Sequence, residues 1–157
     1  MSARNPRLRR DARNPRLRRD ARNPRPRRGE MSVDARTLER IGRLVEKKKG
    51  MIRLSLQACA HCALCAESCF KFRQSGGDPT YTPSYKAINS IGRIWRRKGR
   101  LSEAEYERIR ELVWDKCVLC MRCYCPIGIS IPSLIAVARG ACRERGVQRW
   151  YTTRRNA

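Results

Sequence analysis

Apolar residues recur at helical spacing along this chain, whereas the alternating patterns typical of β-strands are scarce. Residues 34–49 have one apolar face, and the three lysines before Gly50 are typical of a helix end. That face consists of Leu38, Ile41, Leu44 and Val45. The pattern therefore predicts a first helix over residues 34–49 that stops at Gly50.

Two further helices are predicted after a loop that is marked by the glycines and proline of residues 76–79. Pro83 suits the first turn of the second helix, whose apolar face carries Ile88, Ile91 and Trp95. Ser102 and Glu105 have the spacing of a capping box, which predicts the start of the third helix. Its apolar positions are Tyr106, Ile109, Leu112 and Val113, and it runs toward Trp114 and Cys117.

A fourth helix is predicted to begin where Pro132 follows Ser130 and to end at Gly146. Its apolar residues are Leu134, Ile135, Val137, Ala138 and Ala141. The three tryptophans, Trp95, Trp114 and Trp150, are expected to be ordinary core residues. The fold class predicted by these patterns is all-α.

The first thirty residues differ from the rest, because they repeat a nine-residue unit three times with proline and arginine in every copy. Such a segment buries too little apolar surface to offset the entropy of ordering, so residues 1–30 are expected to be disordered. Two interpretations remain open. The repeat is either a basic arm for phosphate groups or upstream DNA read as protein, with the true start at Met31.

Length and charge bound the remainder of the chain. Its 157 residues carry a formal net charge of +23, of which the twelve arginines and three acidic residues of residues 1–30 account for +9. One domain is expected over residues 31–147, followed by a basic tail at 148–157. Basic residues in 93–100 suggest an acidic protein, nucleic acid or an anionic membrane surface as partner, or else a solvated helix face. No apolar run in the sequence approaches the length of a membrane span.

Eight of the nine cysteines fall into two groups of four. The first group is Cys59, Cys62, Cys65 and Cys69, and the second is Cys117, Cys120, Cys123 and Cys125. Cysteines three residues apart can reach neighbouring iron corners of a 4Fe–4S cluster, and in two-cluster ferredoxins the fourth ligand comes from the other group. The spacing therefore predicts two 4Fe–4S clusters held jointly by the two groups.

Other uses of cysteine fit this pattern less well. Structural zinc prefers two separate C-x2-C knuckles, a disulfide framework needs an oxidising compartment, and haem attachment needs a histidine directly after the second cysteine. A Rieske centre needs two histidines, and the chain has only His61, which we interpret as an exposed spacer. Cys142 lies on a predicted apolar helix face and is interpreted as a packed thiol.

The order of these parts resembles the 4Fe–4S dicluster subunit of heterodisulfide reductases and the related iron–sulfur subunits of membrane redox complexes in sulfate reducers. The resemblance covers residues 35–145 and rests on CAHCALCAESC, GGDPTYTPSYKA and WDKCVLCMRCYCP. It implies an α-helical ferredoxin with two 4Fe–4S clusters. Matching residue by residue, it implies that Cys59, Cys62, Cys65 and Cys125 hold one cluster and that Cys117, Cys120, Cys123 and Cys69 hold the other.

The second cysteine group departs from this family at one point. The family has three residues between its last two cysteines, whereas here only Tyr124 separates Cys123 from Cys125. If the backbone were helical there, a step of two residues would turn by about 200°, so that Cys125 would still face away from Cys123.

The resemblance implies an electron-transfer subunit of a cytoplasmic redox complex, either free of the membrane or peripheral to it. The implied partners are a cysteine-rich catalytic subunit and a flavoprotein or ferredoxin donor. The sequence contains no nucleophile with a paired base and no Gly-rich nucleotide loop, so no catalytic site of its own is expected. Two alternatives stay open: an iron–sulfur protein that senses redox state or binds nucleic acid, although nucleic acid is not the expected partner, and a zinc-stabilised interaction module.

Overall fold

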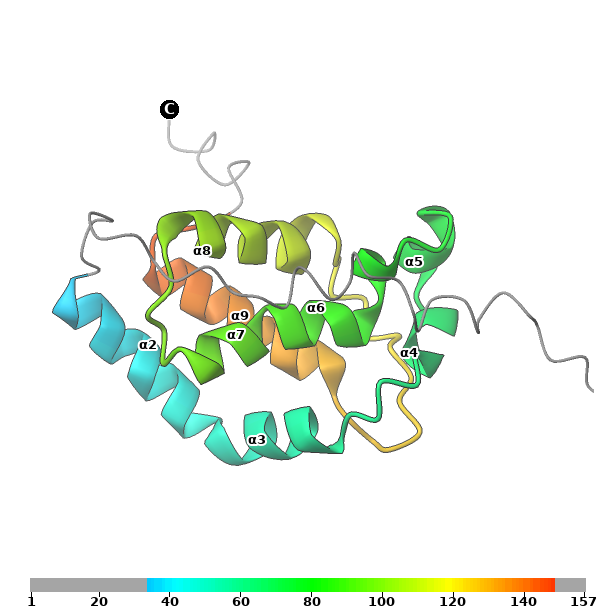
Figure 1. Cartoon of the computed structure of the whole chain (residues 1–157), viewed down its shortest axis with the longest axis horizontal. Helices are drawn as coiled ribbons and strands as arrows, with labels where there is room; N and C mark the ends of the chain where they lie inside the picture. Colours follow the sequence, from blue (N-terminus) through cyan, green and yellow to red (C-terminus); the bar gives the residue numbers. More distant parts are fainter. Residues whose placement is uncertain (1–33, 149–157) are drawn as a thin grey trace, which may run out of the picture. The chain divides into compact units, whose positions relative to one another are not determined.

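The computed structural model describes residues 34–148, and within that range the secondary structure is entirely helical (Figure 1). The helical segments are α2 (Ala35–Lys47), α3 (Lys49–Ala58), α4 (Leu64–Glu67), α5 (Phe70–Gln74), the 3-10 turn η3 (Pro79–Tyr81), α6 (Pro83–Asn89), α7 (Ile91–Arg96), α8 (Glu103–Arg110), the π-helical turn η4 (Glu111–Asp115) and α9 (Ile131–Glu144). The predicted all-α class is confirmed for this part of the chain. The predictions for the repeat, the Met31 start, Trp150 and all of the basic tail beyond residue 148 lie outside the described residues.

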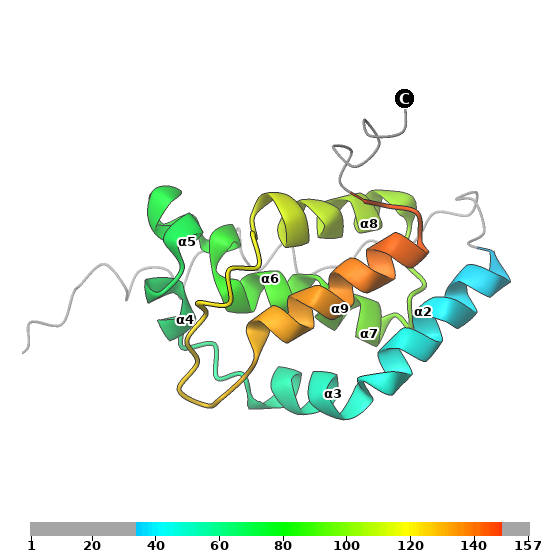
Figure 2. The same ribbon diagram turned by 180° about the vertical axis from the view of Figure 1, so that it is seen from behind.

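Helix α9 is the centre of the packing, because it contacts α2, α6, α7 and α8 (Figures 1 and 2). Its buried residues are Ile131, Pro132, Leu134, Ile135, Val137, Ala138, Ala141 and Cys142. All of these except Pro132 belong to one apolar core with Ile41 of α2, Ile91 and Ile94 of α7, and Tyr106 and Ile109 of α8. Cys142 is fully buried in this core, as predicted for a packed thiol, and burial raises the pKa of its thiol to about 12.

The first predicted helix is confirmed in position, but the prediction that it stops at Gly50 is wrong. The chain breaks at Lys48 and re-enters helix at Lys49, so that Gly50 lies inside α3. Ile52 of α3 is fully buried in the core, and this tertiary contact outweighs the local cost of a glycine in a helix. As a result α3 carries the chain directly to Cys59.

The helix predicted to follow Pro83 is broken in two by Ser90, which separates α6 from α7. The Ser90 hydroxyl is buried and donates a hydrogen bond to the carbonyl oxygen of Lys86 at 2.6 Å. Such bonding back to the preceding turn competes with the regular helix ladder. Ser90 therefore ends α6, and the chain enters α7, whose Ile91 and Ile94 are buried in the core.

The predicted capping box is present at the start of α8, where Ser102 and Glu105 each bind the backbone of the other. Helix α8 then widens into the π-helical turn η4 instead of ending regularly. The fourth predicted helix is confirmed as α9, with Pro132 in its first turn and Gly146 in a left-handed conformation just beyond its end. Trp114 is buried and Trp95 packs against the core, as predicted.

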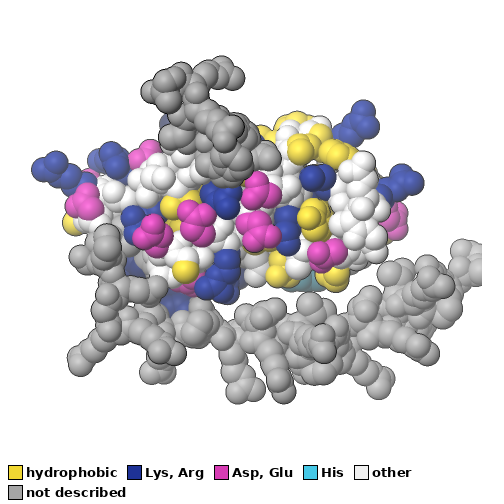
Figure 3. Space-filling model, turned by 90° about the horizontal axis from the view of Figure 1, so that it is seen from above, with side chains coloured by type: hydrophobic (Ala, Val, Ile, Leu, Met, Phe, Trp, Pro, Cys, Tyr) yellow, Lys and Arg dark blue, Asp and Glu magenta, His cyan; other side chains and the backbone are white. Residues whose placement is uncertain are grey.

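On the face seen in Figure 3, the described part of the chain carries basic and acidic side chains side by side. Arg110, for example, pairs with both Glu107 and Asp115. None of the helices within residues 34–148 combines the length and the apolar character needed to span a bilayer.

Gly99 provides a test of the packing between α2 and the turn after α7. Its φ is +75°, and a Cβ there would lie 2.9 Å from Cγ2 of Ile41. We expect Gly99→Ala to lower the free energy of unfolding by about 1–2 kcal/mol for the left-handed backbone and by roughly 1–3 kcal/mol more for the overlap.

Gly146→Ala is the matched control, because Gly146 has a φ of +81° and no atom lies within 4 Å of the position that a Cβ would take there. Denaturant unfolding of anaerobically prepared protein, followed by far-UV circular dichroism, measures both variants. Equal losses in the two variants would show that the contact with Ile41 is unimportant.

Candidate metal centre

The eight grouped cysteines border two separate cavities at one end of the helical core. Cavity one encloses about 480 Å³, part of it open to solvent, and its cysteines are Cys59, Cys62, Cys65 and Cys125. Cavity two encloses about 380 Å³, also partly open, and its cysteines are Cys69, Cys117, Cys120 and Cys123. Each cavity therefore takes three cysteines from one sequence group and the last cysteine from the other.

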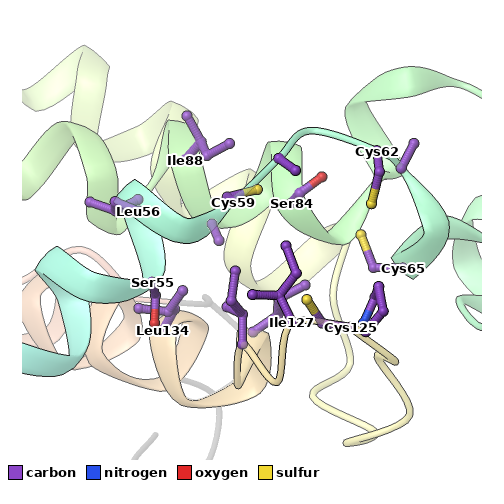
Figure 4. Close-up of a pocket in the computed structure, with 16 residues that line it drawn as sticks. Ser55, Leu56, Cys59, Cys62, Cys65, Ser84, Ile88, Cys125, Ile127 and Leu134 are labelled. Atoms are coloured by element: carbon purple, nitrogen blue, oxygen red, sulfur yellow. The ribbon is translucent and has the colours of Figure 1, made fainter.

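In cavity one the sulfur atoms of Cys62 and Cys65 point toward each other, and that of Cys125 points to the same space from the opposite loop (Figure 4). Cys65 is buried and Cys62 is exposed, and in cavity two Cys69 is buried and Cys120 is exposed. Among residues 34–148, no three His, Cys, Asp or Glu side chains converge as they would around a single metal ion. The four thiols of each cavity instead lie around a space that is larger than a single metal ion.

The backbone has the same unusual conformation in both cysteine loops. The residues on either side of the middle cysteine have positive φ: His61 at 54° and Ala63 at 61° in the first loop, Leu119 at 56° and Met121 at 64° in the second. A left-handed conformation costs about 1–2 kcal/mol at a residue other than glycine. Two independent loops therefore adopt the same strained path around Cys62 and around Cys120.

Backbone N–H groups are available as hydrogen-bond donors in both loops. Within the described residues, no hydrogen bond is donated by the N–H groups of residues 60–63 or of residues 118–123. Successive N–H groups in turns of this kind form concave nests that bind anions, including iron–sulfur clusters. The predicted spacer His61 is indeed exposed, and its backbone conformation is its structural contribution.

The donors and the walls of both cavities fit a 4Fe–4S cluster. Such a cluster takes four thiolates, and each cavity offers four cysteines. The rest of cavity one is lined almost entirely by apolar residues, among them Leu56, Ala87, Ile127 and Leu134. Apolar walls exclude water from a cluster, and N–H donors stabilise its sulfur atoms.

Helix α6 and the start of α9 lie between the two cavities. Ser84, Ala87 and Ile88 of α6 line cavity one, whereas Pro83 and Lys86 of the same helix line cavity two. Ile131 at the start of α9 lines both. A single side chain is thus shared by the two cavities.

Polar residues of the segment GGDPTYTPSYKA fix the position of α6. Asp78 accepts hydrogen bonds from the backbone N–H of Thr80 at 2.8 Å and from its hydroxyl at 2.9 Å. The backbone bond is the main reason that the pKa of the Asp78 carboxyl is lowered. Thr80 in turn accepts a hydrogen bond from Lys116, next to Cys117, so that the segment is tied to the second cysteine loop.

The short spacing between Cys123 and Cys125 is accommodated without a helix. The backbone at residues 122–125 has no regular structure, so the rotation expected for a helical step does not apply. The N–H of Tyr124 donates to the hydroxyl of Ser68 at 3.0 Å, and that hydroxyl lies 3.3 Å from the carbonyl oxygen of Cys65. Ser68 therefore links the two cysteine loops at the one residue that separates Cys123 from Cys125.

Arg139 of α9 holds the entry to the second loop. Its guanidinium donates to the carbonyl oxygens of Val113 at 2.8 Å and Cys117 at 2.7 Å, and it lies over the Trp114 ring at 5.4 Å. Val113 lies in the π-helical turn and Cys117 two residues after it, so these charge-assisted bonds stabilise carbonyls on both sides of the point where the helix ends. The core helix α9 thereby fixes where the loop begins.

Lys86 is the least expected residue of the site, because it is charged and almost fully buried. Its Nζ lies 3.8 Å from Sγ of Cys69 and donates to the carbonyl oxygen of Lys116 at 3.0 Å. Burial, and then the neighbouring thiols of Cys117 and Cys69, raise the pKa of Cys123 to about 12, and the charge of Lys86 opposes this shift.

Sequence reasoning missed three residues that position the cysteines: Ser68, Lys86 and Arg139. None of these three residues has a side chain of a type that is typical of cluster ligands. Lys86 had a signal in the sequence, since it is the lysine of GGDPTYTPSYKA, one of the three segments on which the family resemblance rests.

A protein-family model described as a 4Fe-4S dicluster domain matches residues 55–129, a stretch that contains both cysteine groups and α6. Comparison with curated proteins and with solved structures found no match. The family match indicates two 4Fe–4S clusters and supports an iron–sulfur electron-transfer role.

The link through Ser68 can be tested by comparing Ser68→Ala with Ser75→Ala. Both hydroxyls donate to the carbonyl three residues earlier, but only that of Ser68 also accepts an N–H from the other loop. Losing that bond costs about 1 kcal/mol, so we expect a chelator to remove iron from Ser68→Ala roughly fivefold faster than from the unmodified protein. Loss of visible absorption measures the rate. The contribution of the link would be refuted by equal rates in the two variants.

Proposed function

We propose that this chain is an electron-transfer subunit of a heterodisulfide-reductase-like redox complex, relaying electrons through two 4Fe–4S clusters. The observation that carries the proposal is that the last cysteine of each group lines the cavity of the other group: Cys69 lines cavity two and Cys125 lines cavity one. In a two-cluster ferredoxin each half of the motif supplies the last ligand of the other cluster. The proposal assigns no bond chemistry to this chain.

The ligand assignment is part of the proposal. Cys59, Cys62, Cys65 and Cys125 are proposed to hold one cluster, and Cys69, Cys117, Cys120 and Cys123 the other. The composition of the two cavities supports this division, and so does the matching left-handed backbone around Cys62 and Cys120. When bound, each cluster supplies reversible one-electron oxidation and reduction.

The residues around the cysteines suit electron transfer between neighbours. Cys62 and Cys120 are exposed, so each cavity has one thiol near the surface, where a partner can approach. Cys65 and Cys69 are buried, which limits the access of water and oxygen. Ile131 lines both cavities, so the two sites are neighbours that share one side chain of their walls.

Exposed apolar side chains support a protein partner at this end of the molecule. Those in or next to the cysteine loops are Leu64, Phe70, Val118, Met121, Tyr124 and Ile127. Apolar groups gathered in this way are typical of interaction sites. The proposed partners are a cysteine-rich catalytic subunit and a flavoprotein or ferredoxin donor, in the cytoplasm, where reducing conditions preserve free thiols.

The ligand assignment is tested by asking which substitutions disturb the same cluster. We expect anaerobically prepared protein to contain about eight irons, to be brown and to lose visible absorption with dithionite. Cys59→Ala and Cys125→Ala should alter one electron paramagnetic resonance signal, and Cys117→Ala and Cys69→Ala should alter the other, because each pair borders one cavity.

Cys142→Ala is the control and should retain both signals, because Cys142 lies in the apolar core. If Cys125→Ala disturbed the same signal as Cys117→Ala, the crossed assignment would be wrong. A colourless protein with stoichiometric zinc would refute the proposed function as a whole.

The proposed docking end is tested with Met121→Gln and the matched variant Leu54→Gln, since these side chains are 67% and 68% exposed. We expect tagged protein purified anaerobically from its native cells to carry an iron–sulfur or flavin subunit. Met121→Gln should lower the amount recovered severalfold, because it places a polar group where an apolar contact with the partner is proposed, and Leu54→Gln should not. Mass spectrometry identifies the subunit. Recovery of the chain alone, with its iron intact, would contradict the proposed complex.

A further inference from the structure

The two cavities differ sharply in charge. Lys71, Lys86 and Lys116 line cavity two, whereas no charged side chain lines cavity one. Access to solvent differs less, because each cavity has one exposed cysteine, Cys62 in cavity one and Cys120 in cavity two. Charge is therefore the main feature that distinguishes the surroundings of the two sites.

Lys86 dominates this difference, because it is only 2% exposed and its ammonium group lies 3.8 Å from Sγ of Cys69. Lys71 is partly exposed, so water and salt screen its charge. Lys116 forms an ion pair with Glu111 at 3.4 Å and a hydrogen bond with Thr80 at 2.8 Å. The field of Lys86 inside cavity two is the least screened of the three.

Within residues 34–148, no ion pair with a carboxylate includes Lys86. A buried ammonium group is costly unless an opposite charge compensates it. The neighbours of its Nζ are a carbonyl oxygen and a cysteine sulfur. The compensating charge that this geometry requires is negative and lies in cavity two, which is what a cluster held by four thiolates supplies.

We propose that Lys86 makes the cluster of cavity two the more easily reduced of the pair, so that an electron shared by the two clusters rests there. This inference rests on the proposed function. Reduction adds one negative charge to a cluster, and a buried positive charge beside it stabilises that state more than the oxidised one. In this electron transfer one electron moves from the cluster of cavity one to the cluster of cavity two. No bond forms or breaks, and no proton is transferred.

A redox titration followed by electron paramagnetic resonance tests the role of Lys86. In Lys86→Met we expect the equilibrium constant for reducing one cluster to fall about tenfold, or about 59 mV for a one-electron couple, with the other unchanged. Lys86→Arg keeps the charge and should remain within about threefold of the unmodified protein. Lys47→Met removes an exposed lysine on α2 and should change neither cluster.

Two further variants show which cluster Lys86 affects and provide a test that does not depend on cluster assembly in Lys86→Met. Cys69→Ser should disturb the same signal that Lys86→Met shifts, since both residues border cavity two. Ser84→Lys places an ammonium group on the side of α6 that lines cavity one, and it should make the other cluster easier to reduce. It is informative even if Lys86→Met loses a cluster.

The inference is overturned if Lys86→Met leaves both potentials unchanged or shifts both equally, or if Ser84→Lys fails to raise the potential of the other cluster. Each of these results requires that both clusters are present, so the proposed function would survive it. Protein without iron or sulfide would instead refute the proposed function itself.

Discussion

The site depends on the crossing of two cysteines, since each cysteine loop supplies one thiol to the cavity of the other loop. Cys69 leaves the first loop and borders cavity two, and Cys125 leaves the second loop and borders cavity one. Neither loop can therefore complete a set of four thiols without the other. This constraint brings together two loops that are more than forty residues apart in the sequence, with α6, α7 and α8 between them.

The core helices position the two cysteine loops directly. Helix α9 contacts four other helices and, through Arg139, also fixes the carbonyl oxygens at the entry to the second loop. Helix α6, which Ser90 separates from α7, lines both cavities. Packing of apolar side chains thus determines the positions of polar groups that the loops could not hold alone.

Local strain and buried charge are concentrated where clusters are proposed to bind. Left-handed residues flank Cys62 and Cys120, and Lys86 is buried without a carboxylate partner in the described part of the chain. Each feature is unfavourable by itself, and each becomes favourable beside an anion that accepts backbone N–H groups and balances the ammonium charge. The proposed function accounts for all of these costs with one ligand type.

The sequence by itself determined the all-α class, the capping box at Ser102, the end of α9 at Gly146 and the cysteine spacing that predicts iron–sulfur clusters. These are local properties, set by side-chain periodicity and by backbone preferences within a few residues. The assignment of each cysteine to a cluster stays a prediction, which its grouping in the cavities supports. Only the tertiary structure decided the continuation of helix through Gly50, the link from Ser68 to Tyr124 and the burial of Lys86, because each depends on contact with a segment distant in sequence or on space left by the packed core.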